Sequence, residues 1–281
     1  MKISIDNIKI LREKTGAGFL ECKEALIKNN DSIENAIIFL RKKGLNLSNK
    51  DTSQTKLPGI IFLSIDDKKK NGIIIEVSAE TDFVTKTPDF LLYVQNLSKN
   101  LLYKNKFKTN FNMTHDELCS DNLIKDELLN AMSKFKEKIT INRATRIHVT
   151  NGFLFGYLHN INNYGKIGSI VTIDREYDQF IDKIKDLTMH IVAMNPKYLT
   201  LKSIPIDVLT KEKSLYKDIV KKKYPEKDES VIDKIIIGHV ENFYKTNVFL
   251  KQAFVKNPKI NMEKFINNDF ILLNFVRFES G

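Results

Sequence analysis

The chain has 281 residues, of which 42% are hydrophobic and 28% are charged, and its net charge is +10 at pH 7. This composition predicts a folded protein of about two domains and excludes a globally disordered chain. Apolar runs stay short of the roughly 18–20 residues that a membrane-spanning helix needs, and Asp6 interrupts the N-terminus early. We therefore expect a cytoplasmic protein with no membrane partner.

Residues 1–44 predict a small unit of short helices separated by glycine and asparagine turns. The expected helices cover Ile5–Lys14, Phe19–Lys28 and the segment from Asp31 to Gly44. Asp31 is expected to cap the last of these, because Glu34 completes a capping-box pattern. The polar segment from Leu45 to about Lys56 indicates a linker, so residues 1–55 form the first expected domain.

A β-hairpin is expected next. Gly59–Leu63 and Gly72–Ile75 are apolar, strand-like runs that flank the charged loop Asp66–Asn71. A helix should then begin near Pro88, because proline is tolerated at the first position of a helix.

The turn between this hairpin and the helix contains an unusual group of residues, Thr81-Asp82-Phe83-Val84. An acid beside a large aromatic ring at a strand-to-helix turn can be held out as a rigid wedge. Such a wedge would act on a partner by packing and charge. An isolated Asp-Phe pair is also compatible with a turn acid beside a core ring, so the pair alone leaves both interpretations open.

The order of a hairpin followed by a helix occurs again in the second half of the chain. The expected elements are a helical segment His115–Lys138 broken near Asp121, a strand Ile139–Thr150, a hairpin of Phe153–His159 with Ile167–Ile173, and a helix over 176–194. This repetition predicts an α+β fold whose core has two related halves with antiparallel sheets. The expected subdomains are 56–140 for the N-terminal half, and 141–195 with 246–281 for the C-terminal half.

Residues 196–245 indicate an inserted helical hairpin. Helices are expected over Ile206–Lys223 and Glu229–Lys245, joined at Tyr224–Lys227. A protruding hairpin of this kind is typical of a scaffold or an interaction arm. The chain then returns to the core through a last apolar strand, Phe270–Glu279.

Motifs for bond chemistry are missing from the sequence. It contains no phosphate-binding loop, no nucleophile elbow, and no His or Cys pair with metal-ligand spacing, so we expect a non-enzyme without metal or cofactor. Cys22 and Cys119 are expected to be reduced. The excess of lysine is spread along the chain without an aromatic stacking platform, so direct nucleic-acid recognition is not expected, although a basic surface could steer association with an acidic protein.

Several motifs resemble the translation elongation factor Ts family. Leu11–Leu26, Asp31–Ala36 and Leu40–Gly44 resemble its opening signature, and Thr81–Val84 matches its second signature. Further matches follow in family order at Ile141–Arg143, Gly156–His159, His190–Ala193, Gln252–Val255 and Phe275–Glu279. Together these motifs cover nearly the whole chain.

The resemblance implies a guanine-nucleotide exchange factor for elongation factor Tu, which would bind this partner in its GDP-bound and nucleotide-free forms. It further implies that the N-terminal helices form a ubiquitin-associated (UBA)-like unit that packs on the GTPase domain of Tu. Phe19 and Leu20 match the apolar positions of that contact, with Arg12 nearby. The 206–245 hairpin corresponds to the family's coiled-coil arm.

The same resemblance assigns roles to residues of the core. Asp82 and Phe83 match the wedge that enters between two helices of the GTPase domain and disturbs its magnesium site. His159 matches the histidine that accompanies the wedge. Phe254 and Val255 match a loop that touches a distal domain of Tu.

The chain also departs from the family pattern. It stops at Gly281, where many members carry another C-terminal helix. Lys136 stands where the family usually has glycine, and Lys256 where an apolar residue is common. Two other functions fit parts of the sequence, namely a passive UBA-like adaptor and a basic RNA-binding protein of the translation machinery.

Overall fold

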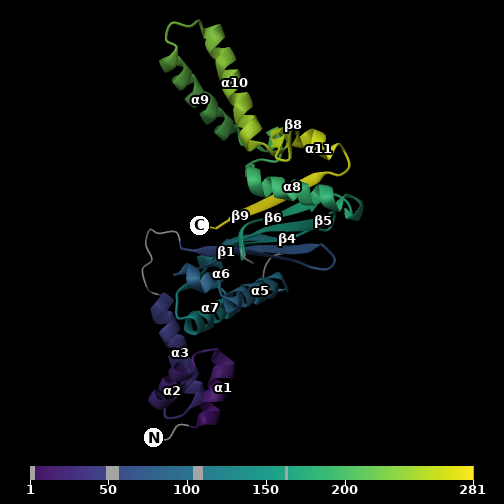
Figure 1. Cartoon of the computed structure of the whole chain (residues 1–281). Coiled ribbons are helices and arrows are strands. Elements are labelled where there is room, and N and C mark those ends of the chain that lie inside the picture. The colour runs from purple at the N-terminus through teal and green to yellow at the C-terminus, as the bar shows by residue number, and fades with distance from the viewer. Residues whose placement is uncertain (1–3, 49–56, 104–109, 162–163, 281) are drawn as a thin grey trace. The chain divides into compact units, whose positions relative to one another are not determined.

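The computed structural model describes residues 4–48, 57–103, 110–161 and 164–280. It divides into two compact units, the first comprising residues 1–148, 158–168 and 278–281 and the second comprising residues 149–157 and 169–277. The structure combines groups of helices with antiparallel strands, which confirms the predicted α+β class (Figure 1). The finer four-part division into domains stays a prediction.

The N-terminal part of the first unit is helical, as expected, with α1 (Ile5–Thr15), α2 (Phe19–Lys28) and α3 (Ile33–Ser48). Gly16 ends α1 with a φ of 68°, a left-handed conformation that favours glycine. The small core between these helices is formed by Ile8, Leu11, Ala17, Cys22, Ala25, Leu26, Ala36 and Leu40.

Two details of α3 differ from the prediction. Ser32 caps the helix, because its hydroxyl accepts a hydrogen bond from the Asn35 backbone at 3.3 Å, whereas Asp31 lies one residue earlier with a φ of 64°. The helix also continues through Gly44 to Ser48. One glycine costs a helix interior only about 1 kcal/mol. The hydroxyl of Ser133 in the core, which donates to the carbonyl of Leu40 at 2.8 Å, holds the chain in place just before this extension.

The rest of the first unit is built on antiparallel strands hydrogen-bonded in the order β3-β4-β2-β1. Their bounds are β1 (Gly59–Ile65), β2 (Asn71–Ala79), β3 (Phe111–Thr114) and β4 (Ile139–His148). Helices α5 (Pro88–Tyr103) and α7 (Asn122–Phe135) cover one face of these strands and bury its apolar side chains (Figure 1).

Strand β3 was not expected, and the helical segment predicted for 115–138 is two helices, α6 (His115–Cys119) and α7. The predicted break is confirmed, because the carboxylate of Asp121 accepts from the backbone N–H groups of Leu123 and Ile124 and caps α7. Helix α7 ends at Phe135, earlier than expected, since Lys136 adopts a left-handed φ of 61°.

A partly buried ion pair links the two central strands. Arg143 Nε of β4 donates to Glu76 Oε2 of β2 at 2.7 Å, and the Arg143 guanidinium also lies 4.1 Å from the ring centroid of Phe278. Two of the sequence motifs singled out above, Ile141–Arg143 and Phe275–Glu279, therefore have a structural role in this unit.

The hairpin of β5 (Phe153–Ile161) and β6 (Tyr164–Ile173) contributes to both units. Its outer part, residues 158–168, belongs to the first unit, where Gly165 pairs with Ile61 of β1. A Cβ at position 165 would lie 2.6 Å from the Ile61 carbonyl oxygen, so only glycine permits this close approach.

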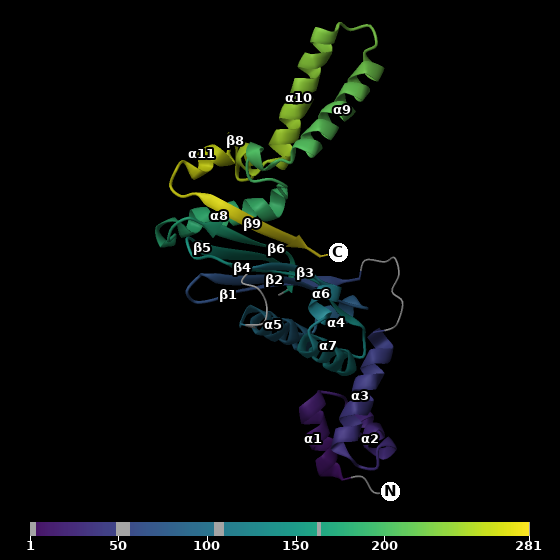
Figure 2. The same ribbon diagram turned by 180° about the vertical axis from the view of Figure 1, so that it is seen from behind.

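The second unit contains the base of that hairpin, most of strand β9 (Leu272–Glu279), which pairs with β6, and helix α8 (Ile181–Met194). Helices α9 (Ile206–Lys223) and α10 (Glu229–Asn247) form the predicted helical hairpin and run side by side (Figure 2). The short strands β7 (Ala253–Phe254) and β8 (Asn257–Asn261) pair with each other, and α11 (Met262–Ile266) follows them. Among the residues described, no helix is both long and apolar enough to cross a membrane.

Candidate functional site

The predicted wedge lies on α4 (Asp82–Thr85), a single helical turn between β2 and α5. Its inner side chains hold it in place, because Val84 packs against the core and the hydroxyl of buried Thr85 donates to the Asp82 carbonyl at 3.0 Å. Its outer side chains are Asp82 and Phe83, and the Phe83 side chain is 80% exposed. The turn therefore presents a phenyl ring to solvent from a base fixed in the core.

Asp82 forms an ion pair next to that ring. Lys86 Nζ lies 2.5 Å from Asp82 Oδ2, at the i, i+4 spacing that brings two side chains together on a helical turn. The hydrogen bond from Lys86 lowers the pKa of the Asp82 carboxyl, and the charge of Lys166 on β6 lowers this pKa slightly further. The tip of the turn thus combines an apolar ring with a carboxylate that stays ionised at neutral pH.

Thr81, the residue before this turn, is held from a distant part of the sequence. Glu137 accepts the Thr81 backbone N–H at Oε2, 2.9 Å away, and the Thr81 hydroxyl at Oε1, 2.5 Å away. The sequence did not identify Glu137, which is 56 residues from Thr81. The strand register could have indicated it, because Ala79 pairs with Ile139 and the next residues on the same side are Thr81 and Glu137.

The residues predicted on the N-terminal helices lie at the surface. Phe19 and Leu20 open α2, and both remain exposed, Leu20 to 77%. Arg12 is exposed on α1, and the buried side of α2 is formed instead by Cys22, Ala25 and Leu26. These helices thus expose both apolar side chains and a cation.

His159 is exposed on β5, in the part of the hairpin that belongs to the first unit. Phe254 and Val255, by contrast, belong to the second unit and differ from each other in burial. Phe254 is only 5% exposed and stacks on Phe265 at a centroid distance of 4.1 Å, whereas Val255 is 43% exposed. Phe254 therefore anchors its loop in the core, and Val255 is the residue that this loop presents to solvent.

A buried histidine fixes the position of Val255. The Val255 backbone N–H donates to His190 Nδ1 at 3.2 Å, and His190 Nε2 lies 3.0 Å from Gln252 Oε1. The Gln252 amide group in turn donates to the carbonyl oxygens of Met194 and Thr246. His190 and Gln252, which were noted in the sequence only as parts of motifs, thus support the exposed loop.

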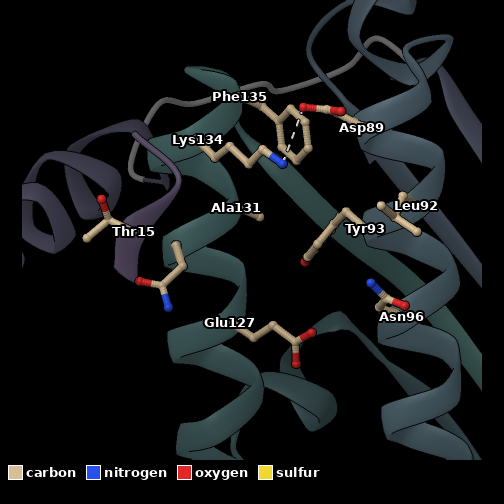
Figure 3. A pocket seen from close by; sticks show the side chains of 10 residues that line it. Thr15, Asp89, Leu92, Tyr93, Asn96, Glu127, Ala131, Lys134 and Phe135 are labelled. Atoms are coloured by element: carbon tan, nitrogen blue, oxygen red, sulfur yellow. Dashed lines mark ion pairs between the residues drawn. The ribbon is translucent and has the colours of Figure 1, made fainter. Parts of the chain in front are cut away.

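A pocket of about 290 Å³ opens between α5 and α7, with Thr15 of α1 at its rim (Figure 3). The Tyr93 side chain reaches into it, and its buried hydroxyl has no hydrogen-bond partner among the described residues. Lys134 and Asp89 form an ion pair at 3.4 Å on its edge. The side chains that line the pocket include no histidine, cysteine or serine.

Comparison with known proteins extends this picture to the whole chain. The family model described as Elongation factor TS matches residues 80–281. A protein of Halothermothrix orenii named Elongation factor Ts is 36% identical over 290 residues, covering 100% of this chain and 93% of that protein. Proteins of the same name from Clostridium botulinum and Clostridium kluyveri are each 32% identical and cover 99% of this chain. These alignments also include the N-terminal helices, which the family model does not match.

Proposed function

The chain belongs to the elongation factor Ts family, and we propose that it acts as a guanine-nucleotide exchange factor for elongation factor Tu. In this role it binds the GDP-bound partner, disturbs the partner's Mg²⁺ site and promotes GDP release, so that GTP can bind. The factor makes and breaks no covalent bond, and we assign it no catalytic residue. It would work in the cytoplasm, where translation takes place.

The observation that carries this proposal is the exposure of Phe83 on a turn whose base is fixed in the core. A ring that makes few contacts within its own chain gains contact energy when it enters a partner. Because Val84 and Thr85 hold the backbone, little ordering of the turn is needed on binding. Phe83 thus supplies packing and Asp82 supplies charge at the disturbed Mg²⁺ site.

The energy required is within reach of such a contact. Nucleotide and exchange factor weaken each other's binding to the GTPase equally, because the coupling between two sites is reciprocal. A thousandfold weakening of GDP binding corresponds to about 4 kcal/mol. Burying a phenyl ring contributes about 1.5–3 kcal/mol, and a few polar contacts supply the rest.

The other exposed residues extend the proposed interface. Phe19 and Leu20, with Arg12 nearby, contact the GTPase domain, and His159 contacts it beside the wedge. Val255 contacts a distal domain of the partner, with Phe254 holding the loop from inside. Thr81 and Val84 serve as the fixed base of the wedge.

The proposal is tested by measuring release of fluorescently labelled GDP from purified elongation factor Tu. Phe83→Ala should slow catalysed release at least about tenfold, the effect of losing roughly 1.4 kcal/mol of contact energy, while circular dichroism shows a folded chain. Tyr103→Ala is the matched control, because Tyr103 is also an exposed aromatic residue, 64% exposed at the end of α5, and lies outside the proposed interface.

The GDP-release assay, together with an RNA-binding assay, separates the two other functions considered for this chain. A passive adaptor would bind elongation factor Tu and leave the rate of GDP release unchanged at every concentration. An RNA-binding protein would retain RNA at physiological ionic strength with a strong salt dependence. A release rate that the wild-type chain leaves unchanged, or that Phe83→Ala raises as much as the wild type does, would contradict the exchange function.

A further inference from the structure

The turn that carries Phe83 is too short to hold its own shape. Helix α4 has four residues, and a single helical turn is not stable in isolation because nucleation of a helix is unfavourable. The hydroxyl groups of Thr85 and Thr87 donate to backbone carbonyls within the same segment. These local bonds shape the turn and leave its orientation relative to the sheet to other contacts.

Glu137 provides such a contact from across the sheet. Both of its carboxylate oxygens accept hydrogen bonds from Thr81, at 2.9 Å from the backbone nitrogen and at 2.5 Å from the hydroxyl. Two hydrogen bonds to one carboxylate fix the orientation of Thr81 as well as its distance from Glu137. Thr81 directly precedes α4, so its orientation sets the direction in which Asp82 and Phe83 leave the sheet.

The sheet itself places Glu137 opposite Thr81. Strands β2 and β4 pair Ala79 with Ile139, and continuation of that register brings Thr81 opposite Glu137 just past the strand ends. Lys136, in its left-handed conformation, ends α7 and turns the chain into β4 immediately before Glu137. The Thr81–Glu137 clamp therefore connects the turn to the junction of α7 and β4.

We infer that Glu137 is a positioning residue for nucleotide exchange, which acts by holding the Phe83 turn through Thr81. This inference rests on the exchange function proposed above. It makes a specific claim, namely that Glu137 matters for exchange only while the Phe83 ring is present.

The experiment is a double-mutant cycle in the full chain, with labelled GDP release and thermal unfolding measured for each variant. Glu137→Ala should slow catalysed release about tenfold, as expected when bonds to a charged group are lost. In the Phe83→Ala background the same substitution should change the rate less than about twofold. The decrease in the midpoint of thermal unfolding caused by Glu137→Ala should be equal in both backgrounds.

Two conservative variants and one control variant complete the double-mutant experiment. Glu137→Gln keeps an acceptor for the Thr81 N–H and should retain more activity than Glu137→Ala, and Thr81→Val, which keeps that N–H, should be intermediate. Glu117 also accepts the backbone N–H and hydroxyl of a threonine in this unit, Thr114, at 2.8 and 3.0 Å, but through one carboxylate oxygen and within the local capping box of α6. Glu117→Ala should leave the release rate unchanged.

The outcomes are distinguishable. If Phe83→Ala slows release but Glu137→Ala does not, the positioning role is wrong and the exchange function stands. If Glu137→Ala slows release equally in both backgrounds, or if Glu117→Ala has the same effect, Glu137 acts through general stability and the inference is overturned. Normal release by Phe83→Ala would overturn the proposed function and this inference together.

Discussion

Lys136 ends α7 in a left-handed backbone conformation, and its ammonium group lies 3.7 Å from the carboxylate of Glu21 in α2. A residue with a Cβ is disfavoured in this conformation, which is why glycine is preferred just past the end of a helix. The resemblance of the sequence to the family likewise implies that Lys136 stands where glycine is usual. Lys136 therefore has an unfavourable backbone conformation, and its side chain forms an ion pair between the N-terminal helices and the end of α7.

We predict that Lys136→Gly raises the free energy of unfolding by about 0.5 kcal/mol. Relief of the left-handed strain should contribute about 1 kcal/mol, and loss of the largely exposed ion pair should subtract less than that. Urea unfolding measures the difference. Lys136→Met is the control, because it removes only the charge and should be neutral or slightly destabilising. A glycine variant less stable than the methionine variant would show that the backbone is not strained.

A second prediction concerns the ion pair at the exposed turn. In Lys86→Met the pKa of the Asp82 carboxyl should rise toward its ordinary value of 3.8, because the hydrogen bond that lowers it is lost. Because 3.8 is still far below 7, Asp82 stays ionised at pH 7 in Lys86→Met. GDP release should therefore slow far less in Lys86→Met than in Asp82→Asn. NMR titration follows the pKa, and the release assay follows the rate. Equal slowing in both variants would indicate that exchange depends on the ion pair instead of the carboxylate.

Much of this fold could be predicted from local patterns in the sequence. Apolar spacing located α1, α2 and the helical hairpin, and Pro88 marked the start of α5, because each signal lies within the element that it predicts. Strand β3 and the β7–β8 pair were not predicted, since all three strands are short and partly polar. Strand β3 also owes its pairing to β4, which lies far along the chain.

The candidate site shows the same limit. The wedge residues are contiguous, so the sequence identified them together, whereas Glu137 reaches Thr81 only through the pairing of two strands. Residue type also did not reveal side-chain direction. Phe254 was expected at a partner surface, but it stacks on Phe265 within its own core, which leaves Val255 as the exposed member of the pair.

A third prediction is a pH dependence that originates at His190. Burial lowers the pKa of its imidazole below the ordinary 6.5, and both ring nitrogens are already engaged with Gln252 and Val255. The unfolded chain therefore binds a proton at this residue below pH 6.5, whereas the folded chain resists it. The contribution of neutral His190 to the free energy of unfolding should be fully present above that pH. It should decrease as the pH falls, by at most about 1.4 kcal/mol per pH unit.

Urea unfolding at pH 7.5 and pH 5.5 measures this loss, and NMR titration reports the His190 pKa directly. His190→Asn removes the titrating group and should show a weaker pH dependence than the wild type, because the remaining histidines contribute equally to both. If both proteins lose the same stability between these pH values, His190 is not the source. An imidazole pKa at or above 6.5 in the folded chain would contradict the prediction as well.

The last prediction concerns the hydroxyl of Tyr93 in the pocket between α5 and α7. A buried hydroxyl without a partner is destabilising, typically by about 1–3 kcal/mol relative to a satisfied one, and burial also raises the pKa of this phenol. Tyr93→Phe keeps the ring contacts with Phe90 and Phe135. We therefore expect the free energy of unfolding to stay constant or to rise by up to about 1 kcal/mol.

Tyr177→Phe is the matched control for Tyr93→Phe, because the buried Tyr177 hydroxyl donates to the Leu154 carbonyl at 2.8 Å. Removing that hydroxyl leaves the carbonyl without this donor and should lower the free energy of unfolding by about 1 kcal/mol. Urea unfolding of both variants against the wild type should show a loss of stability only in Tyr177→Phe if the two hydroxyl groups differ as described. A comparable loss in Tyr93→Phe would mean that the pocket supplies this hydroxyl with a partner, such as a bound water molecule, whose contribution equals that of a protein carbonyl.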